Sequence, residues 1–565
     1  MPIPGGVLMV HFVAAMLCLQ PAAPIDLYPL MDAIDPGRAL PLMADVPDAD
    51  RVRADLTLEP TEPYRWVFDT GDDIALRVAA TQEQPREEAV LTVWDWERRP
   101  VAQRVYELPV ETSVSLAVRG RGTYLLTLDI MRQDECAARL ARSLAVLPSN
   151  AELREEWLDG EFFLGTCSFP ERQHWANDYG PAHPPGLSEQ QSRELDAELT
   201  ARLGMQVVRY APPPGTVYPG EGADLDFELA DACYRTLVDQ GFALELQLIG
   251  TPPWMVQEQY ADVEDPKWRY PPRLEPWTEF VAACVERYAD ATLFYEVNNE
   301  VDQLDFWRGT PQEYLEYFDA TAEVIRELDP DAIITNGGYA YCVSEPGWTG
   351  LIARGLVGDI DWVAYHSHGW IPEIKDELHA IRAIHAAAGF QDPVIVNTEM
   401  GHAAWRLDQE REMAATAAQK VLYCWAQGHR GALLYASREI GGPRQIGADY
   451  GYLDYTFCPR WMYGVVGALV HAYAGATFEH TLVESPGLHA YLFLRGDDCL
   501  LALFAPDNVP KSVSVDADAE GAILIGPMGN EEAVSLDQPV TAGLYPITIR
   551  LEGADPGAVS ISLPE

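Results

Sequence analysis

Two glutamates end apolar stretches of the chain, where a carboxylate would normally be costly to bury. Glu300 closes the segment LFYEVNNE (293–300), and Glu399 closes VIVNTE (394–399). A carboxylate is tolerated at the end of a buried strand where water or a substrate meets it. Two carboxyl groups facing each other across a sugar-sized cleft are the requirement for glycoside hydrolysis, in which one donates a proton and the other attacks or stabilises the anomeric carbon. We therefore predict that Glu300 and Glu399 form a catalytic pair.

Other polar and aromatic residues follow apolar stretches in the same way. Arg209 is placed to pair with an ionised Glu399 and to lower its pKa. Asn299 offers an amide to a sugar hydroxyl, and tryptophans offer flat faces to sugar rings. The predicted substrate-binding residues are Asn299, Arg209, His366, His368, Trp254, Trp370, Trp405, Tyr435 and His174.

The elements that must position these residues are short apolar strands that alternate with amphipathic helices. Eight strands are predicted, at 162–168, 205–211, 242–250, 292–300, 332–338, 360–369, 393–401 and 431–439. The helices between and after them are predicted at 188–203, 225–240, 275–290, 311–328, 348–356, 373–388, 409–427 and 459–473. Eight such repeats predict a (β/α)₈ TIM barrel, whose chemistry lies at the carboxyl ends of its strands. A doubly wound sheet is the competitor, but GTCSFPERQ after the first strand is not a glycine-rich phosphate turn.

β-rich regions flank this barrel, which we assign to residues 151–474. Residues 25–150 contain alternating segments such as AVLTVWDW and GTYLLTLDI, separated by Gly/Asp turns, and they predict an antiparallel β-sandwich. Residues 475–565 contain the hairpin HAYLFLRGDDCLLALFA and predict a second sandwich. Residues 1–24 form a candidate secretion signal, although no Lys or Arg precedes their apolar run. A secreted or periplasmic location follows if this segment is cleaved, and a cytoplasmic one otherwise.

With these strand ends in order, residues 155–475 resemble clan A glycoside hydrolases, the retaining superfamily that contains β-xylosidases, endoglucanases and β-mannanases. The shared motifs are Asn299-Glu300 on strand four, Glu399 on strand seven, Arg209 on strand two, His366 on strand six and GTPPWM after strand three. The resemblance implies that Glu300 is the acid/base, Glu399 the nucleophile and Asn299 the contact of the sugar 2-hydroxyl. It also implies a barrel with an appended C-terminal sandwich.

Two departures from the clan A pattern point to an unusual subfamily. Many members have His-x-Tyr on strand six, whereas this chain has His366-x-His368. Many end strand eight with a tryptophan that stacks on sugar, whereas LLYASREIGG offers Tyr435. The expected substrate is a β-linked, neutral sugar, with exo action favoured over endo action; the sugar, the linkage and the oligomeric state are left open.

Three alternatives remain open from the sequence. His366 and His368 form an H-x-H pair of the kind that holds zinc in metal-dependent barrel hydrolases. A barrel that binds carbohydrate without turnover is the second alternative, and Glu439 in place of Glu399 as nucleophile is the third. We expect Glu296 to be a buried supporting carboxylate and Asp302 a loop acid. The leading prediction needs neither a cofactor nor a metal.

The composition excludes some partners. The formal net charge is −48, which argues against binding to nucleic acid or to anionic membranes. No stretch after residue 24 reaches 18 apolar residues, so no transmembrane helix is expected. The nine cysteines include no C-x-x-C pair, and their wide spacing predicts isolated buried thiols rather than a disulfide framework.

Overall fold

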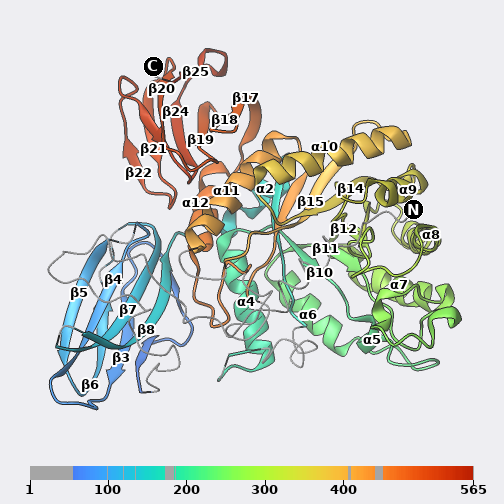
Figure 1. Cartoon of the computed structure of the whole chain (residues 1–565), viewed down its shortest axis with the longest axis horizontal. Helices are drawn as coiled ribbons and strands as arrows, with labels where there is room; N and C mark the ends of the chain where they lie inside the picture. The colour runs from blue at the N-terminus through green and yellow to red at the C-terminus, as the bar shows by residue number, and fades with distance from the viewer. Residues whose placement is uncertain are drawn as a thin grey trace, which may run out of the picture.

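The computed structural model describes residues 55–97, 99–116, 118, 120–133, 135–171, 183–184, 186–404, 409–439 and 450–563. A barrel with two flanking sheet domains makes up this part of the chain (Figure 1). The candidate secretion signal lies outside the described residues. None of the described helices has the length and apolar character that crossing a bilayer requires.

The predicted (β/α)₈ barrel is confirmed. Its strands are β9 (Phe163–Cys167), β10 (Val207–Tyr210), β11 (Ala243–Leu248), β12 (Thr292–Val297), β13 (Ile334–Asn336), β14 (Trp362–Ser367), β15 (Val394–Met400) and β16 (Gly431–Leu434). They pair in parallel and in chain order, and β16 closes the barrel against β9. Each lies within one of the eight predicted stretches, since short apolar runs between helices are typical of parallel strands buried on both faces.

Helices cover the outside of the barrel at the predicted positions. They are α4 (Glu189–Leu203), α6 (Glu228–Asp239), α7 (Leu274–Tyr288), α8 (Pro311–Leu328), α9 (Pro346–Leu356), α10 (Ile371–Ala388), α11 (Glu410–Ala426) and α12 (Trp461–Tyr473). Ser188 and Thr310 cap α4 and α8 through capping boxes with Gln191 and Glu313. The short helix α5 (Pro214–Val217) was not predicted.

The inside of the barrel is layered from bottom to mouth. Phe163, Phe294 and Trp362 fill the amino-terminal end, with ring centroids 5.3–6.3 Å apart. These rings, together with Val207, Val396 and Leu433, form a core of their own, separate from the core between strands and helices. We call this set the apolar plug. Polar side chains begin above it, at the level of Arg209, so the barrel is a packed core at one end and a site at the other.

The N-terminal β-sandwich has two sheets around one core. One sheet contains β1 (Thr57–Pro60), β3 (Ile74–Ala80) and β6 (Val110–Leu116); the other contains β2 (Val67–Phe68), β8 (Glu135–Val146), β7 (Gly122–Arg132), β4 (Glu87–Trp94) and β5 (Pro100–Glu107). Apolar residues at alternate positions of both sheets meet in that core. The pairing is antiparallel except for the two-residue strand β2, which runs parallel to β8.

The C-terminal domain is also a pair of sheets. The larger has the order β17 (Thr477–Ser485), β18 (Leu488–Arg495), β19 (Asp498–Phe504), β24 (Ile547–Glu552), β21 (Gly521–Ile525) and β22 (Glu531–Ala533). The smaller contains β23 (Val540–Ala542), β20 (Lys511–Asp516) and β25 (Ser560–Ser562). The predicted hairpin is β18–β19, and Gly496 takes a positive φ of 60° in its turn.

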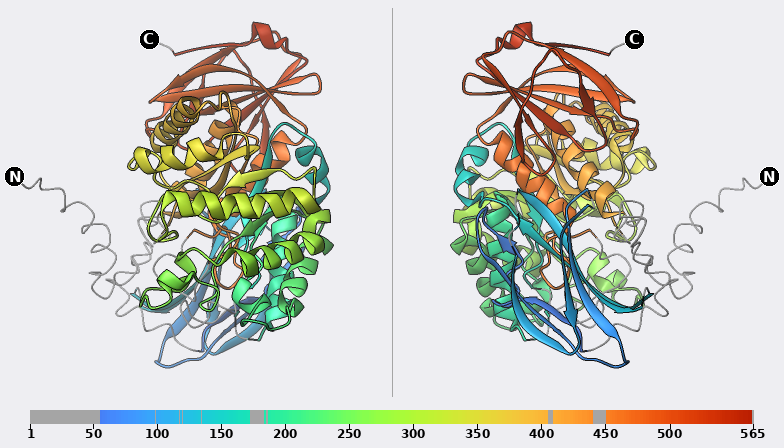
Figure 2. Two further views of the ribbon diagram at one scale, coloured as in Figure 1. Left: turned by 90° about the vertical axis from the view of Figure 1, so that its right-hand side faces the viewer. Right: turned by 90° about the vertical axis from the view of Figure 1, so that its left-hand side faces the viewer.

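The N-terminal sandwich packs against α12 and the C-terminal sandwich against α11 (Figures 1 and 2). Phe493 of the C-terminal domain contacts Trp425 of α11 and Tyr473 of α12, with ring centroids 4.8 and 5.1 Å apart. On the other side, Asn150 donates to the carbonyl of Gly467 on α12 at 2.8 Å. The eight described cysteines are buried and free, as predicted; Cys18 lies outside the described residues.

Candidate active site

Glu300 lies on a sharp turn directly after β12. Asn298 and Glu300 both have left-handed backbone conformations, with φ of 77° and 42°. Such conformations are unfavourable for non-glycine residues and are found where a site requires them. Gly337 makes room for this turn, because a Cβ there would lie 2.6 Å from the carbonyl oxygen of Val297 and 2.8 Å from the nitrogen of Asn299.

Glu399 lies near the end of β15, next to β14 in the barrel. One carboxylate oxygen of Glu300, one of Glu399 and one ring nitrogen of His368 all lie within 4.8 Å of one another. Both glutamates are largely buried, at 7% and 8% exposure. The two carboxylates that the sequence singled out thus meet at the mouth of the barrel.

Neighbouring side chains hold both oxygens of Glu300. His366 Nδ1 lies 2.7 Å from Glu300 Oε1. Gln303, in the turn that follows, donates from its amide nitrogen to Glu300 Oε2. Because Gln303 also donates its backbone N–H to the carbonyl of Glu300 at 3.0 Å, the turn and the carboxylate are fixed together.

Arg209 reaches up from β10 into a group of acceptors. Its Nη1 donates to Glu399 Oε1, and its Nη2 donates to Glu296 Oε1 and, at 2.6 Å, to Asn299 Oδ1. Glu296 is fully buried, as expected of a supporting carboxylate. Gln247 of β11 adds bonds to Glu296 at 2.9 Å and to Asn299 Oδ1 at 3.1 Å. The guanidinium therefore connects Glu399 to the layer below it.

Glu245 of β11 is a further carboxylate in this layer. It is fully buried, and its Oε1 lies 3.0 Å from Arg209 Nε. Burial, and then the charge of Glu296, raise the pKa of Glu245 well above its ordinary value although Arg209 opposes the shift. The neutral form of Glu245 is therefore favoured, which leaves more of the positive charge of Arg209 for Glu296 and Glu399.

The surroundings of Glu399 shift its pKa. Burial acts to raise its pKa, but His366, Arg209 and His368 together bring the pKa of Glu399 well below its ordinary value. In turn, Glu399 and Glu300 raise the pKa of His366 against the effect of burial. Glu399 is thus ionised at neutral pH, and the neighbouring His366 favours this charged carboxylate.

His368 is the second histidine beside Glu399. Its Nε2 lies 3.4 Å from Glu399 Oε2, while His366 Nδ1 lies 3.7 Å from the same oxygen. The rings of Tyr435 and Tyr450 contact His368 edge-on, at centroid distances of 5.5 and 5.3 Å. Glu399 raises the pKa of Tyr435, after burial, which places the tyrosine beside the carboxylate pair.

The predicted aromatic contacts differ in their surroundings. Trp370 is partly buried just beyond β14, with its ring 4.5 Å from that of His402. Burial lowers the pKa of His402 to about 4, so that ring is neutral at neutral pH. The indole N–H of Trp254 is bound to the carbonyl of Tyr218, and Arg273 lies over its ring at 5.7 Å. His174 and Trp405 lie outside the described residues.

Two other acids have structural partners. Asp302 is buried and accepts from the backbone nitrogens of Ala340 and Tyr341, both at 2.9 Å. Glu439, the alternative nucleophile, accepts from the backbone of Tyr455 at 3.2 Å and lies 3.5 Å from Arg460. Its carboxylate is therefore directed toward Arg460 and the chain after β16.

Lys420 of α11 supports the site from behind. It is 1% exposed, and its Nζ donates to the carbonyl of Ser367 at 3.0 Å and to that of Gly401 at 2.7 Å. Ser367 lies between the two histidines, and Gly401 lies two residues after Glu399. Burial lowers the pKa of Lys420 to about 8. One ammonium thus ties the ends of β14 and β15 together.

Sequence reasoning missed several members of the site: Glu245, Gln247, Gln303, Tyr450 and Lys420. Glu245 and Gln247 carried a readable signal, because they occupy alternate positions of the apolar stretch FALELQL and so point into the barrel together. Gln303 lies in a turn, Tyr450 lies outside the described strands and helices, and Lys420 lies on a helix. Nothing in the local pattern marks them.

The group Glu300, His368 and Glu399 has the composition of a metal site. Carboxylates and imidazoles are ordinary ligands of zinc or manganese. His366, which the metal hypothesis also needs, instead directs Nδ1 to Glu300. Its Nε2 faces Gly338, where a Cβ would lie 2.2 Å away.

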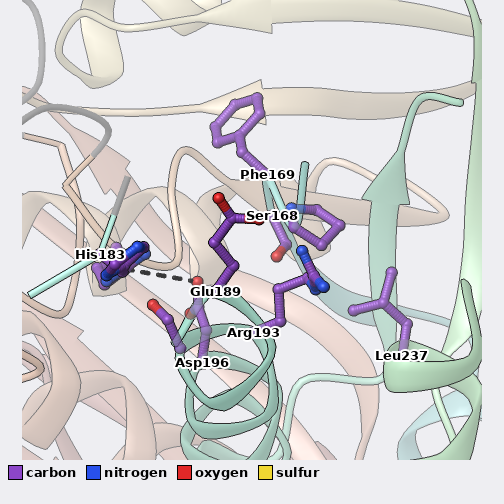
Figure 3. A pocket seen from close by; sticks show the side chains of 10 residues that line it. Ser168, Phe169, His183, Glu189, Arg193, Asp196 and Leu237 are labelled. Carbon is purple, nitrogen blue, oxygen red and sulfur yellow. Dashed lines mark ion pairs between the residues drawn. The ribbon is translucent and has the colours of Figure 1, made fainter. Parts of the chain in front are cut away.

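A separate pocket lies beside α4 (Figure 3). Its lining residues are Ser168, Phe169, Pro170, His183, Glu189, Ser192, Arg193, Asp196, Leu237 and Arg438. Glu189, Arg193 and Asp196 project from α4 and Leu237 from α6. Neither Glu300 nor Glu399 is among them, so this hollow is distinct from the carboxylate pair.

Comparison with solved structures identifies the class of fold. A family 39 glycoside hydrolase from the gut symbiont Bacteroides cellulosilyticus WH2 is similar with a TM-score of 0.66 at 15% identity, covering 88% of this chain and 100% of that one. A GH39 β-xylosidase from Caulobacter crescentus is similar with a TM-score of 0.50 at 17% identity, covering 70% and 96%. The sequence matches no protein-family model and no curated protein. The fold, a TIM barrel with attached β-sandwiches, is therefore one that glycoside hydrolases also have.

Proposed function

We propose that this chain is a retaining glycoside hydrolase that cleaves a β-linked, neutral sugar by double displacement, with Glu399 as nucleophile and Glu300 as acid/base. The observation that carries the proposal is the approach of their oxygens to within 4.8 Å at the barrel mouth. Retaining enzymes hold the two carboxyl groups about 5–5.5 Å apart, whereas inverting enzymes need roughly 6.5–9.5 Å to admit a water.

In the first step, Glu399 attacks the anomeric carbon as Glu300 gives its proton to the departing oxygen. Arg209 holds Glu399 Oε1, whereas the nearest histidine nitrogens are 3.4 and 3.7 Å from Oε2. Oε2 is therefore the oxygen we assign to the attack. The lowered pKa of Glu399 keeps it ionised for this role.

In the second step, Glu300 takes a proton from water, whose oxygen attacks the anomeric carbon and releases Glu399. Asn299 Oδ1 is occupied by Arg209 and Gln247, which leaves its amide nitrogen to donate to a sugar hydroxyl. His366, His368, Trp370 and Tyr435 are the groups we propose to contact the sugar. His174, Trp254 and Trp405 remain predicted contacts, and exo action remains the preferred mode.

The test separates the two glutamates by leaving group. Glu300→Ala should keep much of its glycosylation rate on a dinitrophenyl glycoside, which needs little protonation, and lose most activity on a natural glycan. Azide should accelerate this variant by attacking the glycosyl-enzyme, to give a β-glycosyl azide. The matched control is Glu327→Ala, an exposed glutamate of α8, which should behave as wild type. If azide instead rescues Glu399→Ala and gives an inverted product, the roles of Glu300 and Glu399 are reversed. If both Glu300→Ala and Glu399→Ala are fully active, the proposal of a glycosidase is refuted.

A metal-dependent hydrolase is the second candidate, because Glu300, His368 and Glu399 converge as metal ligands do. The two candidates differ in their response to chelation. The glycosidase we propose should keep its activity after exhaustive treatment with EDTA. Loss of activity that zinc or manganese restores would favour the metal-dependent enzyme instead.

A further inference from the structure

Exposed aromatic side chains are concentrated at one sector of the barrel mouth. Among the described residues, Trp268 and Tyr341 are the aromatics in the set of exposed large apolar side chains, at 39% and 43% exposure. Trp268 lies in the loop between β11 and α7, and Tyr341 in the loop between β13 and α9. Leu304, in the loop between β12 and α8, is 52% exposed. With Phe306, whose ring contacts that of Trp268 at 5.6 Å, we call these residues the aromatic shelf.

Polar contacts join the three loops of the shelf. Asp302 binds the backbone nitrogens of Ala340 and Tyr341, which fixes the second loop to the third. Arg269 and Asp305 form an ion pair at 3.9 Å between the first loop and the second. The carbonyl of Arg269 also accepts from the backbone N–H of Arg308 at 2.8 Å. These contacts fix the three loops that carry the shelf to one another.

The shelf adjoins Glu300 rather than Glu399. Leu304 and Phe306 belong to the turn that carries Gln303, the residue that donates to Glu300. Tyr341 is close enough to Glu300 that, after burial, this carboxylate is the largest influence raising the pKa of the phenol. Glu399 projects instead from β15, with Tyr435 and Tyr450 on its side of the mouth.

The position of the aromatic shelf beside Glu300, the proposed general acid, indicates what the shelf would bind. A general acid must contact the glycosidic oxygen, so the leaving group must extend from the site past Glu300. Exposed apolar surface beside a site is favourable only if a partner covers it, and flat aromatic faces suit the apolar faces of rings. We infer that the aromatic shelf binds the leaving group of the substrate, and that this leaving group is a chain of sugar rings.

This inference rests on the proposed function. Three substrates that share the same sugar and differ in their leaving group test the inference and the proposed function separately. A glycosyl fluoride has no ring in its leaving group, a 4-nitrophenyl glycoside has an aromatic ring, and a trisaccharide extends two sugar rings over the shelf. The sugar is the one that a screen of nitrophenyl glycosides identifies. Hydrolysis of the fluoride by wild type tests the proposed function alone, because the shelf takes no part in it.

The variants are Trp268→Ala and Tyr341→Ala, with Leu351→Ala, an exposed residue of α9, as the control. Each shelf variant should lower kcat/KM on the trisaccharide about tenfold, mainly through KM, while turnover of the fluoride stays within about twofold of wild type. The control should change neither value. The thermal midpoint of each variant shows whether it is folded.

Three results would overturn the inference. One is unchanged turnover of the trisaccharide in both variants, and another is an equal loss on the fluoride, which would mean a damaged site. The third is a loss on the nitrophenyl glycoside with none on the trisaccharide, because the shelf would then accept aromatic leaving groups and not sugar chains. If wild type hydrolyses no fluoride, the proposed function fails instead.

Discussion

The two ends of the barrel interior are built from the same eight strands and behave as opposites. At the amino-terminal end, the apolar plug is made of fully buried rings such as Phe163 and Phe294. At the carboxyl end, Arg209 is surrounded by Glu245, Glu296 and Glu399. The side chains of the plug are hydrocarbon apart from the indole N–H of Trp362. The mouth concentrates three carboxyl groups around one guanidinium, which is unfavourable for stability unless protons and hydrogen bonds compensate.

The compensation at the mouth is incomplete. Among the described residues, Glu296 Oε2 and His366 Nε2 are buried without a hydrogen-bond partner. Such groups cost stability and are retained mainly where function requires them. Burial and the charge of Glu296 favour the neutral form of Glu245, which reduces part of this cost. The comparison therefore predicts that plug variants lose stability, whereas mouth variants lose activity or its pH dependence.

The largest effect on activity is expected for Glu399→Gln. Removing the nucleophile should lower kcat at least about 10⁴-fold on every substrate, since both steps of a double displacement need it. The variant should also lose a pH-dependent part of its stability. Because the folded pKa of Glu399 lies below its ordinary value of 4.5, its ionised form stabilises the fold above that pH, and this contribution is lost as the pH falls below it.

Urea titrations at several pH values check the second part. The difference in unfolding free energy between wild type and Glu399→Gln should be larger at pH 7 than at pH 3. Glu327→Gln, at an exposed position on α8, is the control and should show neither effect. A constant difference across this range would show that Glu399 is not held ionised by its neighbours.

The plug should respond in the opposite way. Phe294 is fully buried between Phe163 and Trp362, so Phe294→Ala should lower the unfolding free energy by about 3–5 kcal/mol through lost contacts and a cavity. The kcat of the folded variant should stay within about threefold of wild type, because the Arg209 layer lies between the plug and the carboxylate pair. A loss of kcat comparable to that of a mouth variant would break the comparison.

His366→Asn should change the pH dependence of activity. Without His366, the pKa of Glu399 should rise, because a neighbour that lowers it is gone. The acid limb of kcat/KM should therefore move to higher pH, and kcat/KM at pH 7 should fall about tenfold to a hundredfold. His379→Asn, an exposed histidine of α10, is the control. An unmoved acid limb would show that Arg209 and His368 keep Glu399 ionised without His366.

How much of this could be predicted depended on whether the signal was local. Apolar runs such as VIVNTEM predict strands, and the Thr-Pro start of α8 predicts where that helix begins. The alternation of such strands and helices then predicts the barrel. Glu300 and Glu399 could be found because strand ends converge in any such barrel. Gln303 and Lys420 could not, since their contacts are set by the course of a turn and the rotation of a helix.

The roles predicted from single aromatic residues are the least determined by sequence. Trp254 was chosen from its position after a strand, but its indole N–H is bound to the carbonyl of Tyr218, which belongs to another loop, and Arg273 at the start of α7 lies over its ring. The His366-x-His368 spacing raised the question of a metal. The structure turns His366 toward Glu300, a choice of side-chain orientation that spacing alone does not determine.

The smallest expected effect belongs to Lys420, which supports the mouth without entering it. Lys420→Met keeps the length of the side chain but leaves the carbonyls of Ser367 and Gly401 without their donor. We expect kcat to fall about threefold to tenfold with KM little changed, because the histidines and Glu399 lose alignment but the sugar contacts remain. Lys375→Met, at an exposed lysine, should leave both constants unchanged.

A pH titration of stability distinguishes this lysine from an ordinary buried contact. Its pKa is lowered from 10.5 to about 8, so between these values the unfolded chain binds a proton that the folded chain does not. Stability rises with pH wherever the unfolded state binds more protons, and wild type should gain stability across this window. Lys420→Met has no such group and cannot gain stability in this way. The difference in unfolding free energy between wild type and variant should therefore grow from pH 8 to pH 10.5. Parallel curves for the two proteins would mean that Lys420 keeps its charge in the fold, and that its two carbonyl contacts outweigh its burial.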